Sequence, residues 1–467
     1  MREDYSADGN AWNFITHEKA RSNAYRWGEE GIGGISDAKQ LLCFAPAFWN
    51  GKDPFLKERL FGLTGPQGNH GEDVKELYYY LDSTPTHSYA KMLYKYPQHE
   101  FPYEGLVFQN QIRNREQTEF ELIDTGIFDE NKYFDIFIEY AKADTDDILI
   151  KITAYNRGKE AAPLAILPTV WFRNYWSYTN VNSKPQLKSL SQNALSIKQD
   201  DLGEMVLYCD QPQEIVFCDN ETNSMRVHGF VSRLKYFKDG VNDYIVHGNW
   251  GAVNPEKIGT KAAAVYRLYV EGEGSVTVKL RLAKSDGTVK EKPFEDFDEL
   301  FAIREAEANQ FYAEIQRRVK DEELRMIQRQ AFAGMMWCKQ FFYYHVRPWL
   351  EGDPAMPAAD SRRNGRNAAW KHMTCNDIIS MPDNWEYPWF AAWDSAFHCL
   401  TIARIDPDFA KEQLLLFVSD GYQHPNGQIP AYEWNFSDVN PPVHAWSVLR
   451  VFQIEKKQRN GEGDYEF

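Results

Sequence analysis

Apolar and polar side chains alternate along much of residues 131–290, and this pattern constrains the fold more than any other feature of the chain. Phe134–Tyr140 and Ile148–Ala154 alternate as half-buried strands do, and the turn-forming run Asp144–Asp147 separates them. Further strand segments are 164–172, 205–209, 215–218, 262–270 and 275–282. Because no long helical pattern interrupts the series, we predict an antiparallel β-sandwich, with a hairpin at Gly272–Gly274 joining its last two strands.

The flanking regions have a different character. Residues 1–130 are rich in Gly, Asn, Asp and aromatic residues and show little regular period, which predicts a loop-rich region packed with the sandwich. Residues 291–323 show helical spacing and predict a linker helix. From residue 324 to 467 the chain predicts helices separated by aromatic loops, so the fold class is multidomain α+β. The predicted helices are 324–344, 389–405, 408–420 and 442–458.

Charge and composition exclude several classes of partner and cofactor. The chain has 52 Lys and Arg against 68 Asp and Glu, a formal charge of −16, which argues against nucleic acid and against an anionic membrane surface. No stretch approaches the apolar length of a membrane span. Six scattered cysteines without C-x-x-C spacing indicate a reducing, cytoplasmic compartment. The 11 histidines form no metal motif and no phosphate-binding loop is present, so we expect no metal and no cofactor.

Carboxylates surrounded by aromatic rings remain as the best candidate chemistry. Met381–His398 contains three tryptophans and three carboxylates, and Pro388 can begin a helix there. In such a helix Asp394 lies one turn from both Phe390 and Phe397. Apolar rings disfavour the charged carboxylate, and we therefore expect a raised pKa, as a general acid requires. From spacing alone, an Asp that pairs with an arginine or caps a neighbouring helix fits equally well.

A second cluster lies in the loop and helix start between residues 421 and 446. Amides and aromatic rings together on a loop are typical of a sugar subsite, in which rings stack on pyranose faces and amides bond the hydroxyls. The candidate substrate-binding residues here are Gln428, Tyr432, Glu433 and Trp446. A tightly packed loop between two helices would have much the same composition.

Three motifs together resemble a known family of enzymes. They are Trp393-Asp-Ser-Ala-Phe-His398 with Trp389 before it, Asn426-Gly-Gln-Ile-Pro430, and Asn440-Pro-Pro-Val-His-Ala-Trp446. They resemble the six-hairpin glycosidases, above all glycoside hydrolase family 63 and its mannosylglycerate hydrolase-like relatives. Arg2–Trp12 and Gly71–Lys75 look like the glucosidase branch of that group, so that the resemblance extends over nearly the whole chain.

This resemblance implies a fold, a reaction and roles for particular residues. The fold is an N-terminal β-sandwich followed by an (α/α)6 barrel, of which residues 324–467 would be the first part. The reaction is inverting hydrolysis of α-glucosides or oligosaccharides by two carboxylates about 6.5–9.5 Å apart. Asp394 matches the family's general acid. Trp389 matches a residue that lines the sugar pocket, and Trp393 would shape the same subsite.

The second carboxylate of such an enzyme is not found by the same comparison. The family's general base is a glutamate several hundred residues after the acid, whereas about seventy residues follow Asp394 here. We therefore expect an incomplete chain that is inactive by itself, and we rate Glu433 or Glu386 low as substitute bases. Two other functions stay open: a non-catalytic carbohydrate-binding protein built on the sandwich, and a glycoside phosphorylase that binds phosphate at the basic loop Asp360–Arg366.

Overall fold

The computed structural model describes residues 16–25, 27–60, 74–179, 183–285, 287–352, 358, 360–365, 367–432 and 435–467, with the side chains of 432 and 435–439 outside the description. Two compact units make up this part of the chain. The β unit contains the described residues of Phe14–Tyr79 and His87–Ala306. The helical unit contains Tyr80–Thr86 and Glu307–Phe467.

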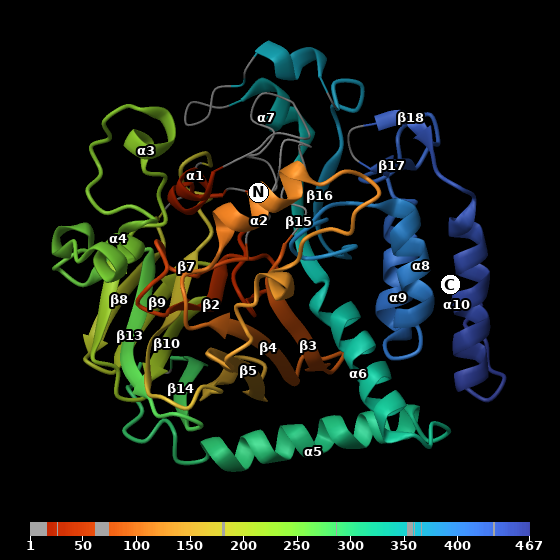
Figure 1. Ribbon diagram of the computed structural model, residues 1–467. Helices are drawn as coiled ribbons and strands as arrows, with labels where there is room; N and C mark the ends of the chain where they lie inside the picture. Colours follow the sequence, from red (N-terminus) through yellow and green to blue (C-terminus); the bar gives the residue numbers. More distant parts are fainter. Residues whose placement is uncertain are drawn as a thin grey trace. The chain divides into compact units, whose positions relative to one another are not determined.

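A five-stranded antiparallel sheet lies in the β unit (Figure 1), with the order β1-β2-β7-β13-β11. Its strands are β1 (Ile35–Ser36), β2 (Leu42–Trp49), β7 (Ala162–Phe172), β13 (Lys261–Val270) and β11 (Glu214–Cys218). The register places Cys43, Trp171 and Lys261 side by side on β2, β7 and β13. These three side chains therefore point to the same face of the sheet.

A nine-stranded antiparallel sheet has the order β12-β8-β9-β10-β14-β6-β5-β4-β3. Its strands are β12 (Ile258–Gly259), β8 (Gln186–Ser191), β9 (Ala194–Gln199), β10 (Gly203–Cys209), β14 (Ser275–Lys284), β6 (Asp147–Asn156), β5 (Tyr133–Asp144), β4 (Tyr89–Pro97) and β3 (Leu77–Ser83). The predicted turn at Asp144–Asp147 joins β5 to β6 as a hairpin. The prediction of antiparallel sheets in this part of the chain is confirmed.

Buried aromatic residues pack the two sheets against each other. The Phe44 ring of β2 meets Tyr140 of β5 edge-on, with ring centroids 6.2 Å apart. Phe48, also on β2, stacks on Tyr94 of β4 at 6.0 Å. These side chains are between 0 and 3% exposed, so they form the interior of the β unit. Full burial of one such ring stabilises a fold by roughly 1.5–3 kcal/mol.

Two expectations for the β unit are wrong. Gly272–Gly274 does not form a hairpin, because β13 and β14 belong to different sheets and the turn crosses between them. A side chain at Gly272 would meet the carbonyl oxygen of Lys159 at 2.0 Å, so a close backbone approach explains this glycine. The first 130 residues are also more regular than predicted, since β1–β4 lie there. Short helices complete the unit: α1 (His17–Ser22), α2 (Tyr103–Ile112), η2 (Leu122–Thr125), α3 (Ser224–His228), α4 (Gly240–His247) and η3 (Trp250–Ala252).

The predicted linker helix corresponds to α5 (Phe297–Ile315), and the division between the two units falls within it, at Ala306. The helical unit continues with α6 (Glu322–Trp337), β15 (Lys339–His345), α7 (Val346–Glu351), η4 (Asp360–Asn364), β16 (Thr374–Ser380), α8 (Ala392–Ile402), α9 (Pro407–Leu416), β17 (Pro430–Tyr432), β18 (Asn435–Val439) and α10 (Val443–Gln458). The expected helix 324–344 is wrong in its last part, because α6 ends at Trp337. Lys339–His345 forms a strand that pairs with β16 instead.

Apolar side chains from five helices form the core of the helical unit. Tyr312 of α5, Met336 of α6, Cys399 of α8, Leu414 of α9 and Val451 of α10 lie in one buried cluster. Helices α8, α9 and α10 contact one another (Figure 1). The chain is therefore a mixed α and β protein, and the (α/α)6 barrel stays a prediction. In the described part of the chain, none of the helices combines the length and apolarity that crossing a bilayer requires.

Candidate active site

The loop before α8 is held by hydrogen bonds to the helical unit. Asp383 Oδ1 accepts from the backbone N–H groups of Trp385 and Glu386 at 2.7 and 2.8 Å. These local hydrogen bonds stabilise a turn within the loop. The Asn384 amide donates to the Trp337 carbonyl at 2.9 Å and to the Tyr80 hydroxyl at 3.1 Å. These contacts fix the point from which the chain enters the helix.

The helix itself begins later than the sequence predicts. Trp389 and Phe390 precede α8, and both are buried. The Phe390 ring packs on Phe417 and Tyr422 with centroids 5.2 and 5.3 Å away. Trp389 packs edge-on against Tyr387 at 5.0 Å. Tertiary packing therefore sets the start of the helix at Ala392, and Phe390 does not share its surface with Asp394.

Asp394 lies in the first turn of α8, where the positive end of the helix dipole favours a carboxylate. Its side chain is half-buried. Within the described ranges it has no ion pair with an arginine and no hydrogen bond, and the cap position of α8 is Ala391. Neither ordinary explanation for a half-buried aspartate, a salt bridge or a helix cap, accounts for this residue. The carboxyl group is left available to a ligand.

His398 lies one helical turn after Asp394, and burial lowers its pKa against the opposing effect of the Asp394 charge. Its Nδ1 and the Ser380 hydroxyl are 3.0 Å apart. The Ser395 hydroxyl donates in turn to the Ser380 carbonyl at 3.0 Å, so α8 is bound to the end of β16 on this side. A neutral imidazole beside Asp394 leaves the carboxyl group without a cationic partner on its own helix.

An exposed row of aromatic rings runs beside Asp394. The Trp393 and Phe397 rings are 6.0 Å apart on successive turns of α8, and Phe397 meets Trp446 of α10 at 5.7 Å. Both contacts are edge-on in geometry. The three side chains are 39, 43 and 43% exposed. Flat apolar surface of this kind beside a carboxyl group suits a sugar ring.

The second predicted cluster has only part of its side chains within the description. Gln428 lies in a tight loop, where its N–H donates to Asn426 Oδ1 at 2.9 Å and its carbonyl accepts from the His424 N–H at 2.9 Å. The Asn440 amide donates to the carbonyls of Ile429 and Pro430 at 2.9 and 3.0 Å, which closes this loop. The strand that follows it, β17, contacts α8 and ends at Tyr432. Glu433 lies outside the described residues.

The structure thus brings some predicted site residues together and separates others. Trp393 and Trp446 join one aromatic row through Phe397, beside Asp394, whereas Trp389 is buried and packs against Tyr387. The sequence prediction had not selected Phe397 or His398 as site residues. Their spacing of three and four residues from Asp394 places them on the same helix face and could have identified them.

One arginine of the loop predicted to bind phosphate has its own contacts inside the helical unit. Arg362, the first arginine of the loop proposed for phosphate, is buried, donates to the Trp349 carbonyl at 3.1 Å and lies over the Trp349 ring. Its guanidinium therefore serves packing. A group of three or more His, Cys, Asp or Glu side chains placed to hold a metal ion is not found among the described residues.

Residues 387–465, which include all of α8, α9 and α10, match the family described as the mannosylglycerate hydrolase MGH1-like glycoside hydrolase domain. This segment is therefore similar to a family of glycoside hydrolase domains, and the match confirms the resemblance that its motifs predict. Over 513 aligned residues the chain is 45% identical to uncharacterized protein YMR196W of Saccharomyces cerevisiae, with coverage of 99% of this chain and 47% of that protein. The chain thus spans about half the length of this curated relative.

Two solved structures share distant similarity with the chain. A family GH92 α-mannosidase, BT3965 from Bacteroides thetaiotaomicron, is 11% identical, with 97% of this chain and 57% of that chain covered and a TM-score of 0.29. A putative kojibiose phosphorylase from the human microbiome is 8% identical, with 86 and 49% covered and a TM-score of 0.25. At TM-scores this low, neither likeness identifies a fold for this chain.

Proposed function

We propose that the chain carries the acid half of an inverting, α-glucosidase-like glycoside hydrolase of the family 63 type. The observation that carries this proposal is the position of Asp394 inside the matched glycoside hydrolase segment: half-buried, without a partner in the described part, and beside an exposed aromatic row. Asp394 protonates the leaving-group oxygen.

The aromatic row gives the substrate a place to bind. Trp393, Phe397 and Trp446 are partly exposed, and their flat apolar rings suit stacking on the apolar face of a pyranose. We assign Gln428 and Tyr432 to the same subsite, because β17, which ends at Tyr432, contacts α8. Glu433 and Trp389 are assigned to it from the sequence motifs. The substrate class is a glucoside or an oligosaccharide, bound without a cofactor.

The general-acid role is tested with Asp394→Asn. The chain is assayed alone and together with any further part of the protein needed for turnover, on a glucoside with an alkyl leaving group and on one with a dinitrophenyl leaving group. General acid catalysis contributes about 10²- to 10⁴-fold, so kcat/KM for the alkyl glucoside falls by that factor. The dinitrophenyl glucoside needs no proton on its leaving group, and its turnover falls far less.

Asp408→Asn is the matched control, because Asp408 is the acidic residue in the first turn of the neighbouring helix α9 and its side chain is 74% exposed. It removes a comparable charge from a comparable helix position and leaves turnover unchanged. Equal losses on both substrates, or full activity of Asp394→Asn, would contradict the role of Asp394. The anomer released first, read by NMR, decides inversion, and turnover that depends on phosphate would indicate a phosphorylase instead.

A further inference from the structure

A cavity of about 30 Å³ lies in the β unit beside strands β2, β7 and β13 and is partly open to solvent. A water molecule needs about 10–15 Å³ of such space, so the cavity holds roughly two waters or a group of that size. Its walls come from distant parts of the chain: the three strands, α1, and the connections at Glu29, Glu58 and Lys238. All of these belong to one compact unit.

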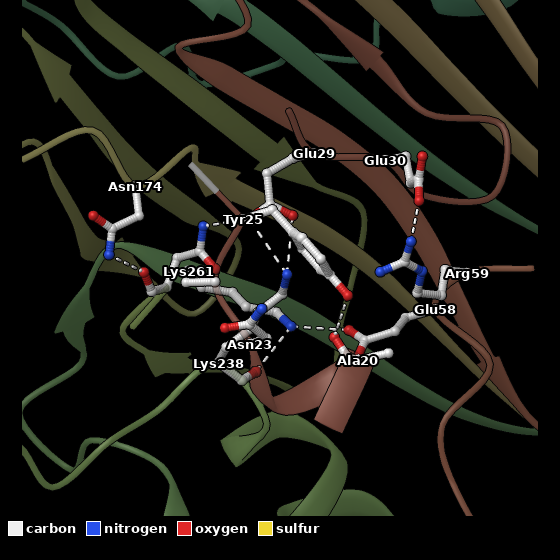
Figure 2. Close-up of polar contacts among 12 residues, drawn as sticks. Ala20, Asn23, Tyr25, Glu29, Glu30, Glu58, Arg59, Asn174, Lys238 and Lys261 are labelled. Atoms are coloured by element: carbon white, nitrogen blue, oxygen red, sulfur yellow. Dashed lines mark hydrogen bonds and ion pairs between the residues drawn. The ribbon is translucent and has the colours of Figure 1, made fainter. Parts of the chain in front are cut away.

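Three ion pairs line this cavity, and Figure 2 shows their side chains facing one another. The pairs are Lys238–Glu29 at 3.0 Å, Lys261–Glu58 at 2.9 Å, and Arg59–Glu30. Lys261 also donates to the Lys238 carbonyl at 3.0 Å. Because each carboxylate here has its own cation, the three pairs add no net charge to the cavity.

One further charged residue lines the cavity without an ion pair in the described part of the chain. Arg21, on α1, lies 5.9 Å from the Phe55 ring, and its buried Nε has no hydrogen-bond partner. A buried donor that loses its hydrogen bond costs about 1–3 kcal/mol, and more if it is charged. Arg21 therefore leaves the cavity with one positive charge in excess.

A second donor in the lining is also unsatisfied. Trp171, on β7, is 7% exposed, and its indole Nε1 is buried without a hydrogen-bond partner among the residues that the structure describes. An indole nitrogen only donates, so its partner has to be an acceptor. Buried Trp side chains ordinarily find such a partner. The cavity thus combines a positive charge, two free N–H donors and space for about two oxygen-sized atoms.

We propose that this cavity binds the carboxylate group of a small organic acid, with Arg21 supplying the charge and the Trp171 indole a second hydrogen bond. A carboxylate only accepts hydrogen bonds, and its two oxygens match the available space. Bonds from a guanidinium to a carboxylate are roughly twice as strong as those between neutral groups. A neutral hydroxyl group would leave the excess charge uncompensated, and a cation would be repelled by it. The site lies in the β unit, so its occupancy does not depend on the function proposed for Asp394.

The experiment compares acetate with acetamide, which has the same shape and no charge, on the full chain at constant ionic strength. Binding is measured by calorimetric titration and by the rise in the thermal unfolding midpoint, since a ligand that binds only the folded state stabilises it. We expect acetate to bind at least about tenfold more tightly than acetamide. Arg21→Gln removes the charge and Trp171→Phe removes only the indole N–H, and each weakens acetate binding by about tenfold or more.

Matched controls separate this site from general effects of charge and of tryptophan loss. The controls are Arg347→Gln, whose side chain is 76% exposed, and Trp250→Phe, at a residue that is 75% exposed. We expect both variants to bind acetate as the wild type does. Circular dichroism verifies that each variant is folded, and Trp171→Phe alone decides the matter if Arg21→Gln does not fold. Equal binding of acetate and acetamide, or unchanged acetate binding in Trp171→Phe, overturns the proposal and leaves the cavity to water.

Discussion

Asp394 and His398 occupy the same face of α8, one turn apart, and the charge of Asp394 acts on the pKa of His398. Burial lowers the pKa of His398, so the imidazole is neutral near pH 7 and does not form a salt bridge with the carboxylate. A general acid has to release its proton and recover it in each cycle. An ion pair with a protonated histidine would hold the carboxylate in its charged form. The neutral His398 thus suits the role proposed for Asp394.

His17 gives a pH-dependence that can be measured on stability. Burial first, and then the charges of Lys57, Arg21 and Arg59, lower its pKa from about 6.5 to about 3. The unfolded chain therefore binds this proton more readily than the folded chain does. Stability from the neutral imidazole is complete above about pH 6.5 and is lost progressively as the pH falls toward 3.

The variant His17→Phe keeps a ring against Phe55 and Tyr103, whose centroids lie 4.6 Å from the His17 ring, and removes the titration. We expect its free energy of unfolding, measured in urea at several pH values, to fall less steeply below pH 6.5 than that of the wild type. His247→Phe, at an exposed position, keeps the wild-type slope. A parallel pH-dependence of wild type and His17→Phe would show that the proton is not excluded from the folded state.

The position of Asp394 could be predicted because its motif is local, whereas its surroundings depend on distant packing. Phe390 was expected on the same helix surface, but Phe417 and Tyr422 bury it before the helix begins. Phe397 gains its place in the aromatic row from Trp446, nearly fifty residues later on α10. Contacts at that separation leave no periodic signal in a single sequence.

At the scale of helices, a buried lysine joins α9 to the chain's last helix. Lys411 on α9 donates to Glu455 on α10 at 2.9 Å and to Asp464 at 2.8 Å. Lys411 is 8% and Glu455 1% exposed. Burial alone would lower the pKa of Lys411, but the bonds to Asp464, Glu455 and Asp408 raise it above its ordinary value. The lysine therefore stays charged, and its partners become necessary to the packing of the two helices.

Lys411→Met leaves Glu455 as a buried carboxylate that has lost its lysine partner. Because Arg459 stays paired with Glu455 at 2.6 Å, we expect the free energy of unfolding to fall by about 1.5–3 kcal/mol in urea titrations. Replacing both residues, Lys411→Met with Glu455→Leu, recovers much of that loss, since no charge is then buried. Asp408→Asn removes only the exposed partner, 3.1 Å from Lys411, and costs less than about 1 kcal/mol. A single variant as stable as Asp408→Asn would contradict the role of this pair.

The sequence predicted strands that have one solvent-exposed face, and it did not predict strands that are buried on both faces. β6 and β5 alternate because one side of each is more exposed, and the sequence shows their period of two. β2, Leu42–Trp49, is buried at seven consecutive positions, and so it reads as a continuous apolar run without a period. The strand Lys339–His345 was missed for a different reason, since its pairing with β16 joins residues 29 to 41 positions apart in the sequence.

At the scale of the whole chain, the sequence predicted the change from strands to helices near residue 290, but the compact units do not begin and end at composition boundaries. The β unit takes in much of residues 1–130, because β2 and β4 supply central parts of its interior. The helical unit includes Tyr80–Thr86, where the Ser83 carbonyl accepts from Tyr312 at 2.6 Å and the Asp82 carbonyl from Trp337 at 3.1 Å. Segments so far apart are joined by tertiary contacts that composition does not encode.

The six cysteines report on each unit separately, because all six are buried free thiols. Cys43, Cys209 and Cys218 lie in the β unit, and Cys338, Cys375 and Cys399 lie in the helical unit. Burial raises the pKa of Cys218, Cys338 and Cys399 to about 12, so their reactive thiolate forms are scarce in the folded protein. Labelling therefore requires local or global unfolding.

Each unit has its own apolar core, and we expect each to unfold cooperatively. The chain is incubated in graded urea, pulsed briefly with a thiol reagent and digested, and the labelled peptides are quantified by mass spectrometry. The three cysteines of one unit should become reactive at a common urea concentration, whichever unit unfolds first. Different midpoints within one unit would show that its core is not a single cooperative structure. Lys411→Met provides an internal test, because it should lower the midpoint of Cys338, Cys375 and Cys399 more than that of the other three.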